Sequence, residues 1–386
     1  MPKVTIAEDG GSFDCGEDDT LLRAALRAGI GFPYECNVGS CGTCRFQLLE
    51  GEVENLWPEA PAVHPRDAAK NRWLGCQTRA RGDCEIKVRI DPAAVPEHLP
   101  RRFLAVMERA VALTHDMTEF HFRAEGAASF LPGQYALMTL PGVEGPRAYS
   151  MTGVANAEGD WSFLAKRVPG GAGSAWLFDK VAPGAEITLD GPYGHAWLRP
   201  GTGRPVVCLA GGAGLGPMLS IAKGYLADQP AAAPLRLFYG GRDARDMVDE
   251  ALVRSIPGFA EHGTYVAVAS EPGPDWTGAT GFVHEHALAA LGSVGAPDAF
   301  DWYMAGPPPM IEAARRALIV DHRVPVDQIS TTSSTRAERL ANREKRYGAQ
   351  EGARHRWPGC HRPQSHQPPL DVRRLGHRRR LAARAR

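Results

Sequence analysis

Apolar and polar residues alternate at both ends of the segment 1–93. Residues 4–7 and 12–15 alternate around a glycine turn, which predicts a β-hairpin. A helix is expected next, because leucines and alanines form an apolar stripe over 21–26, with Asp18 and Asp19 before it and Gly29 after it. Alternation returns over 85–90. We therefore expect residues 1–93 to form a separate α+β domain.

The pattern changes twice along the rest of the chain. Prolines 92, 96 and 100 mark a linker, and short β-like runs divided by Pro-Gly turns fill residues 101–200, which predicts a small antiparallel barrel. From 204 to 330, apolar runs at 206–210, 235–239, 265–269 and 302–305 alternate with helical stretches. This alternation is typical of a parallel sheet covered by helices on both faces, so the fold class is a multidomain combination of α+β and α/β.

Composition adds two constraints. The 386 residues have a formal net charge of +0, yet residues 1–330 hold 29 basic and 40 acidic side chains, and the opposite excess lies in 331–386. The body is thus acidic, which disfavours nucleic acid as a partner. There is no apolar run of about 20 residues and no signal-peptide pattern, so we expect a cytoplasmic protein without a membrane span. In that compartment the eight cysteines are not expected to form disulfides.

A cysteine-rich loop carries the most specific motif. Cys36, Cys41 and Cys44 follow the spacing C-x4-C-x2-C, and Cys76 lies downstream, which is the plant-type [2Fe–2S] ligand pattern. A structural zinc site would more often show two C-x2-C pairs. A redox dithiol at Cys41 and Cys44 should open a helix, whereas this segment leads into a strand-like run. We assign all four cysteines as metal ligands.

Two motifs in the barrel region favour a flavin. Arg147, Tyr149 and Ser150 form R-x-Y-S after a probable strand, where Tyr149 offers a flat ring face and Ser150 a hydroxyl donor. Further on, Lys166 precedes a glycine-rich turn in which Gly171, Gly173 and Ser174 would open a helix. Amides at such a helix start bind a pyrophosphate, and Arg147 would add charge-assisted hydrogen bonds. An ordinary turn with a surface arginine is the alternative for each motif alone.

Two glycine-rich strand ends favour a dinucleotide in the region 204–330. The run 206–210 leads into Gly211, Gly212, Gly214 and Pro217, and then a helix from Met218. The motif is not G-x-G-x-x-G, because proline occupies the third glycine position. A second strand ends at residues 305–310, where Gly306 and Pro307 form a tight ledge at the sheet edge that binds ligands.

In this order the motifs resemble the reductase components of bacterial multicomponent oxygenases, within the ferredoxin–NAD(P) reductase superfamily. The resemblance covers residues 1 to about 330. It implies a β-grasp-like [2Fe–2S] ferredoxin domain, an antiparallel FAD-binding barrel and an NAD-binding domain. Tyr149 and Ser150 are then the catalytic residues. The residues implied to bind cofactors are Arg147, Tyr149, Ser150, Lys166, Gly171, Gly173, Ser174, Gly211, Gly212, Gly214, Pro217, Gly240, Arg242, Ala305, Gly306, Pro307 and Met310.

The resemblance also implies the reaction. Members take a hydride from NADH, pass it to FAD, and send single electrons through the cluster to an oxygenase component, in some systems through a separate ferredoxin. We expect a monomer that acts in an aromatic or alkene mono- or dioxygenase system. Ala305 stands where the family commonly has cysteine, so we expect slower hydride transfer. The alternatives are another acceptor, such as a desaturase, and a redox sensor with a basic nucleic-acid-binding tail.

Nucleotide preference and the tail are separate questions. Arg242 could pair with the 2′-phosphate of NADPH, but Asp243, Asp246, Asp249 and Glu250 crowd the same region and favour NADH. Residues 331–386 lie outside the resemblance and are rich in arginine without periodicity. Another reading frame of 330–335 can encode the acidic–aromatic ending usual in the family, so we interpret the tail as frameshifted or disordered sequence.

Overall fold

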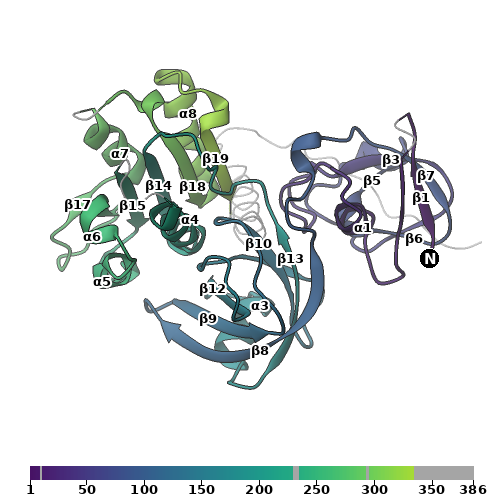
Figure 1. Cartoon of the computed structure of the whole chain (residues 1–386), viewed down its shortest axis with the longest axis horizontal. Helices are drawn as coiled ribbons and strands as arrows, with labels where there is room; N and C mark the ends of the chain where they lie inside the picture. Colours follow the sequence, from purple (N-terminus) through teal and green to yellow (C-terminus); the bar gives the residue numbers. More distant parts are fainter. Residues whose placement is uncertain (9–10, 229–233, 293–294, 334–386) are drawn as a thin grey trace, which may run out of the picture. The chain divides into compact units, whose positions relative to one another are not determined.

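The computed structural model describes residues 1–8, 11–228, 234–292 and 295–333, which all belong to one compact unit (Figure 1). Three main sheets follow one another along the chain, as the sequence predicts. We call the three parts the N-terminal domain (1–93), the barrel domain (101–200) and the C-terminal domain (204–333). The interpretation of the tail lies outside the described residues, apart from residues 331–333.

The N-terminal domain is a mixed sheet with one main helix. The five strands of its main sheet run in the order β2-β1-β7-β3-β5, and β4 and β6 form a separate two-stranded sheet. The expected hairpin is the antiparallel pair β1–β2. Helix α1 buries its apolar stripe, and Thr20 caps it by accepting a hydrogen bond from the Arg23 amide. The elements are β1 (Lys3–Ile6), β2 (Ser12–Asp14), α1 (Leu21–Arg27), β3 (Arg45–Glu50), β4 (Val53–Asn55), α2 (Pro65–Ala68), β5 (Arg72–Leu74), η1 (Gly75–Gln77), β6 (Thr78–Ala80), β7 (Cys84–Lys87) and η2 (Pro92–Ala94).

The barrel domain is a six-stranded antiparallel sheet in the order β11-β10-β13-β8-β9-β12. A bridge between Met151 and Phe163 joins its two edge regions, so the sheet is nearly closed. Trp176 and Leu177 of α3 pack into the core of this barrel. The elements are β8 (Arg101–Ala112), β9 (Met117–Ala124), β10 (Tyr135–Thr139), β11 (Arg147–Ser150), β12 (Asp160–Lys166), α3 (Ala172–Asp179) and β13 (Glu186–Tyr193).

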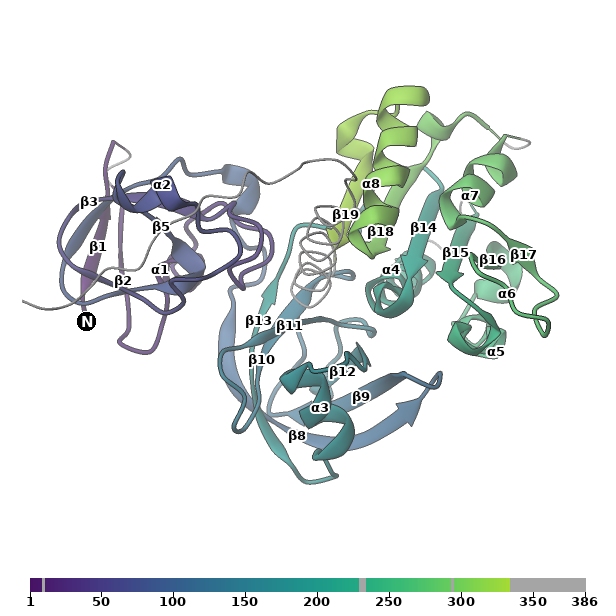
Figure 2. The same ribbon diagram turned by 180° about the vertical axis from the view of Figure 1, so that it is seen from behind.

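The C-terminal domain is a parallel sheet in the order β17-β16-β15-β14-β18-β19, with helices on both faces (Figure 2). Helices α4, α5 and α6 pack on one face, and α7 and α8 pack on the other. The elements are β14 (Val206–Gly211), η3 (Gly212–Gly214), α4 (Leu215–Asp228), β15 (Leu235–Gly241), η4 (Ala244–Asp246), α5 (Glu250–Arg254), α6 (Phe259–His262), β16 (Gly263–Ala269), β17 (Ala279–Thr280), α7 (Val283–Leu291), η5 (Pro297–Ala299), β18 (Asp301–Gly306), α8 (Pro308–Arg316), the π-helical turn η6 (Ala317–Asp321), η7 (Val326–Gln328) and β19 (Ile329–Ser333).

The structure corrects three expectations about element limits. The last strand of the N-terminal domain ends at Lys87, three residues earlier than the alternation predicts. Helix α4 begins at Leu215 and not at Met218, because the glycine turn winds as a 3-10 turn directly into it. The sheet of the C-terminal domain extends past residue 330, since β19 pairs in parallel with β18 up to Ser333.

Candidate functional site

The four cysteines of the motif converge from two segments of the N-terminal domain. Cys36, Cys41 and Cys44 lie in the loop before β3, and Cys76 lies in η1. The Sγ atoms of Cys44 and Cys76 are 3.4 Å apart, and the amides of Ser40 and Cys41 each donate to Cys36 Sγ at 3.3 Å. Paired thiols with amides directed at sulfur fit a [2Fe–2S] cluster, in which each iron takes two thiolates.

Hydrogen bonds within each pair and burial separate the four thiols: the pKa values of Cys36 and Cys44 are raised, and those of Cys41 and Cys76 are lowered. A hydrogen bond from the Cys36 thiol lowers the pKa of Cys41 to about 4, and the bond from Cys44 lowers the pKa of Cys76. Arg23 adds positive charge close to Cys76. Because thiolates are the form that binds iron, Cys41 and Cys76 are the readier ligands, and Cys36 and Cys44 would release their protons on binding the metal.

Arg23 is a residue that the sequence analysis missed. It is buried on α1, where its guanidinium donates from Nε to the Asn37 side chain at 3.2 Å and from Nη2 to the Asn37 carbonyl at 3.3 Å. These bonds hold the cysteine loop to the helix. An arginine within an apolar helical stripe was the available signal, since such a residue is rarely buried without partners.

A positive φ angle explains why position 39 of the cysteine loop is a glycine. Gly39 has φ +78°, and a Cβ there would lie 3.2 Å from atoms of Ala60, Gln77 and Trp57. Only glycine combines this φ with so close an approach at low cost. The loop therefore packs tightly against the segment that follows β4.

The barrel domain brings the two flavin motifs together. Arg147, Tyr149 and Ser150 belong to β11, and Gly171 is the N-cap of α3. A Cβ on Gly173 would lie 3.0 Å from Arg147 Cγ and 3.5 Å from the Tyr149 hydroxyl, so the helix start adjoins both side chains. Burial raises the pKa of Tyr149 to about 12, so its phenol stays neutral. The arrangement offers an arginine, a ring and amide donors along one edge.

The side chains of Ser174 and Lys166 are engaged in other contacts. Ser174 closes its own turn, because its hydroxyl accepts from the Val168 amide at 3.0 Å and donates to the Gly171 carbonyl at 3.0 Å. Lys166 ends β12 and pairs with Asp116 at 3.2 Å. A Cβ on Gly212 would lie 3.9 Å from Lys166 Nζ, so this lysine reaches the glycine turn of the C-terminal domain. Cofactor contacts of both residues stay predictions.

The nucleotide motifs meet at the carboxyl ends of β14 and β18. The two strands pair in parallel, with Ala210 opposite Ala305. A Cβ on Gly214 would lie 2.1 Å from the Ala305 carbonyl oxygen, and one on Gly211 would lie 2.8 Å from Met310 Sδ and 2.9 Å from Pro307 Cδ. Ligands of such sheets bind at this edge, and these glycines let the backbone form it. Gly240 follows on β15 opposite Gly211.

Of the four acidic residues expected near Arg242, the structure pairs Asp246 with it and gives the other three different partners. Arg242 is exposed, and its Nε lies 3.8 Å from the buried carboxylate of Asp246. Asp243 accepts hydrogen bonds from the amides of Gly273 and Ala244, which lower its pKa. Asp249 caps α5, and Glu250 pairs with Arg254. The positive charge of Arg242 is therefore partly neutralised by Asp246.

Polar contacts join the C-terminal domain to the strand end beside Ser150. Lys223 of α4 donates to the Thr152 carbonyl at 3.0 Å, and Ser220 donates to the Gly153 carbonyl. A Cβ on Gly216 would lie 3.8 Å from the Ser150 carbonyl oxygen. The glycine turn of the C-terminal domain thus adjoins the candidate flavin strand. Sequence reasoning missed these residues because they carry no motif.

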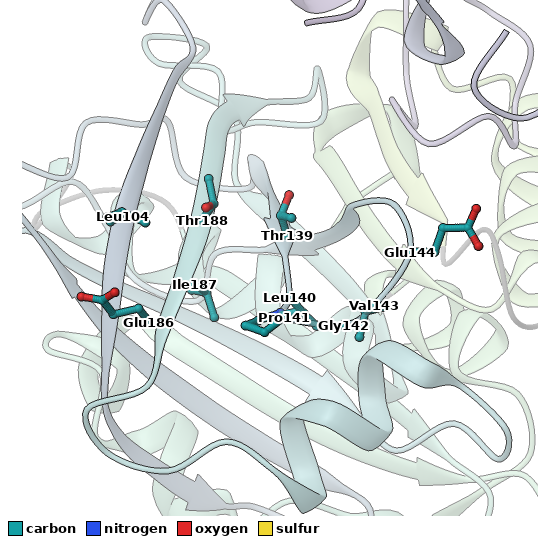
Figure 3. Close-up of a pocket in the computed structure, with 10 residues that line it drawn as sticks. All are labelled: Leu104, Thr139, Leu140, Pro141, Gly142, Val143, Glu144, Glu186, Ile187 and Thr188. Carbon is teal, nitrogen blue, oxygen red and sulfur yellow. The ribbon is translucent and has the colours of Figure 1, made fainter. Parts of the chain in front are cut away.

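An open groove of about 650 Å³ lies elsewhere on the barrel domain. Figure 3 shows Leu104, Thr188 and Thr139 along it, on the neighbouring strands β8, β13 and β10. Glu144 lines one end, and its carbonyl accepts from Arg147 at 2.9 Å. Tyr149, Ser150 and the start of α3 do not line it. This groove is therefore separate from the edge that carries the flavin motifs.

Three family models match the chain in the same order as its domains. The 2Fe-2S iron-sulfur cluster binding domain matches residues 4–81, the oxidoreductase FAD-binding domain residues 105–197, and the oxidoreductase NAD-binding domain residues 208–316. Together they cover the greater part of the chain. The cofactors that the sequence predicts, [2Fe–2S], FAD and NAD, are those of these domains.

Curated relatives cover nearly the same length. The chain is 43% identical over 326 residues to the ferredoxin–NAD(P)(+) reductase CarAd of Metapseudomonas resinovorans, covering 82% of this chain and 94% of that protein. It is 40% identical over 327 residues to the ferredoxin–NAD(+) reductase component of the alkene monooxygenase system of Xanthobacter autotrophicus, covering 83% and 97%.

Solved structures agree. The ferredoxin reductase in carbazole 1,9a-dioxygenase superposes with a TM-score of 0.79 at 39% identity, covering 86% of this chain and 98% of that chain. An Amycolatopsis cytochrome P450 reductase gives a TM-score of 0.73 at 30% identity, covering 87% and 100%.

A multidomain iron–sulfur flavoprotein oxidoreductase is the class that fold and site define. The chain belongs to the family of ferredoxin–NAD(P) reductase components of multicomponent oxygenase systems. The resemblance, the fold class and the enzyme class predicted from the sequence are thereby confirmed. Within the described residues, no helix is both long and apolar enough to cross a membrane.

Proposed function

We propose that this chain oxidises NADH and delivers electrons one at a time to the oxygenase component of an aromatic or alkene oxygenase system, directly or through a separate ferredoxin. The observation that supports this proposal is the contact between the candidate nucleotide turn and the candidate flavin strand. The glycine turn at Gly212–Gly214 leads into Gly216, which packs beside Ser150 of the flavin strand. A nucleotide bound at the turn would thus lie next to a flavin bound along β11.

The bound flavin supplies the chemistry, since it accepts an electron pair as hydride and releases electrons singly. The chain's own residues bind and orient. Tyr149 offers its ring face, Ser150 offers a hydroxyl donor, and Arg147 with the start of α3 offers positive charge for a pyrophosphate. Ala305 is buried near the end of β18 and supplies no thiol there. No acid–base pair is needed for this transfer.

The proposed preference for NADH rests on the carboxylate of Asp246 beside Arg242. A 2′-phosphate brought to Arg242 would approach the carboxylate of Asp246, 3.8 Å from the guanidinium, and would be repelled. Steady-state kinetics with both nucleotides test this directly. We expect kcat/KM to be at least about tenfold higher for NADH, which corresponds to about 1.4 kcal/mol. Equal values, or a preference for NADPH, would contradict the assignment.

We also propose that the protein is a cytoplasmic monomer. The cluster ligands must remain reduced thiols, which a reducing compartment provides. Light scattering of the purified holoprotein measures the oligomeric state, and a mass near 41.6 kDa is expected. Co-purification with the oxygenase component tests whether that component is the partner.

A further inference from the structure

A hydrogen bond connects the barrel domain to the cysteine loop. Tyr135, the first residue of β10, donates from its hydroxyl to the carbonyl oxygen of Glu35 at 2.7 Å. Glu35 immediately precedes the ligand Cys36. Tyr135 is only 7% exposed, and burial raises its pKa well above 10, so the phenol remains a donor. The bond therefore persists over the working pH range.

The same tyrosine also contacts the candidate flavin strand through its backbone. In the β10–β11 register Tyr135 lies opposite Ser150, and in the β10–β13 register it lies opposite Tyr193. One residue thus joins Ser150, through strand pairing, to the residue beside Cys36.

A second tyrosine, which belongs to the N-terminal domain, bonds to the backbone of the barrel domain. Tyr34, from the N-terminal domain, accepts a hydrogen bond at its hydroxyl from the Gly194 amide at 2.9 Å. Its ring lies 4.5 Å from the His195 ring and 6.1 Å from the Tyr193 ring. The two residues before Cys36 are therefore both held to the barrel domain through buried tyrosines, Tyr34 at the end of β13 and Glu35 at the start of β10.

An ion pair supports the junction farther from the cluster. Arg27 of α1 binds Asp190 of β13 through two hydrogen bonds of 2.8 Å, and it also binds Asp19 at 2.9 Å. Tyr193 donates to Asp190 at 2.7 Å. Burial opposes the charge of Asp190, but the bonds from Arg27 and Tyr193 nevertheless lower its pKa. A bidentate pair of this kind adds geometric specificity to the docking of the two domains.

We propose that Tyr135 is a positioning residue that holds the Cys36 end of the cluster loop against the flavin strand. It thereby fixes the gap that an electron crosses between the flavin and the cluster. In this step one electron leaves the reduced flavin and reduces the oxidised cluster, no bond forms or breaks, and the phenol keeps its proton. The inference rests on the proposed function.

Tyr135→Phe in the holoprotein tests the role, because it removes only the hydroxyl. Two readouts are needed: hydrogen exchange at the amides of 36–41, and the rate at which the cluster is reduced after NADH has reduced the flavin. We expect faster exchange and cluster reduction slowed at least fivefold, with the flavin step within twofold of wild type. Tyr193→Phe is the matched control, because it removes a buried junction hydroxyl that does not contact the loop, and it should leave loop exchange unchanged.

Wild-type exchange together with wild-type cluster reduction in Tyr135→Phe would overturn the proposal and leave the proposed function intact. Failure of NADH to reduce the wild-type flavin would overturn the proposed function itself. If Tyr135→Phe does not assemble the cluster, Tyr34→Phe takes its place, because it removes the other hydrogen bond beside Cys36. Unchanged exchange and unchanged cluster reduction in that variant would also overturn the proposal.

Discussion

At the residue scale, Gly214 shows how closely the nucleotide edge is packed. A side chain there would meet the Ala305 carbonyl at 2.1 Å, a distance that requires the backbone to move. The neighbouring strand ends carry the remaining glycines of the motif. A substitution at this position therefore disturbs the nucleotide edge directly, at the Ala305 carbonyl.

We predict that Gly214→Ala raises the KM for NADH at least about tenfold, because the displaced turn no longer fits the dinucleotide phosphates. Flavin and cluster absorbance should be unchanged. Gly82→Ala is the control, since a Cβ there meets nothing within 4 Å and its φ is not positive. An unchanged KM in Gly214→Ala would show that the turn does not bind NADH.

Among the described residues, the cysteines divide into the four predicted ligands and other buried residues. Cys44 lies 3.4 Å from Cys76 and belongs to the converging set, whereas Cys15 is equally buried in the same domain but outside it. We predict that Cys44→Ser abolishes the cluster absorbance and the NADH-dependent reduction of cytochrome c, while flavin-dependent ferricyanide reduction survives. Cys15→Ala should retain all three. A Cys44→Ser protein with a full cluster would refute the ligand assignment.

At the element scale, periodicity predicted most strands and helices, because alternation and apolar stripes are local signals. It missed β19, whose sequence Ile-Ser-Thr-Thr-Ser is largely polar and becomes a strand by pairing with β18. It also missed Thr20 as the cap of α1, which two preceding aspartates obscured. Tertiary pairing, not local propensity, decides such elements.

The loop after β13 makes a pH-dependent contribution. Burial and the nearby charge of Arg199 lower the pKa of His195, whose ring packs on Tyr34. A histidine whose folded pKa is depressed stabilises the fold above its unfolded pKa of about 6.5, and this stability is lost as pH falls through that value toward the folded pKa.

We predict that wild-type thermal stability decreases between pH 7.5 and 5.5 more steeply than that of His195→Phe, which keeps an aromatic ring but cannot titrate. The melting temperatures of both holoproteins across this range provide the measurement. Parallel curves would mean that His195 does not contribute to the acid dependence. Asp91 and Arg199 influence His195 and are unchanged in both proteins.

At the scale of the whole molecule, the sequence predicted three domains and their cofactors because each motif is contained within a short segment. Contacts between domains could not be predicted, since Arg27 and Asp190 or Tyr135 and Glu35 are about 100 residues or more apart and belong to no motif. The acidic balance of residues 1–330 was visible once the tail was separated from the total. A partner that binds this part of the chain would meet a net negative charge.

The central claim is that one chain carries electrons from NADH through a flavin to a [2Fe–2S] cluster. An anaerobic titration of the purified holoprotein with NADH, followed by visible absorbance and electron paramagnetic resonance, tests it most directly. We predict that the flavin absorbance bleaches and that the reduced-cluster signal then appears in the same sample without any added mediator. A bleached flavin beside a cluster that stays oxidised, or no response to NADH, would contradict it.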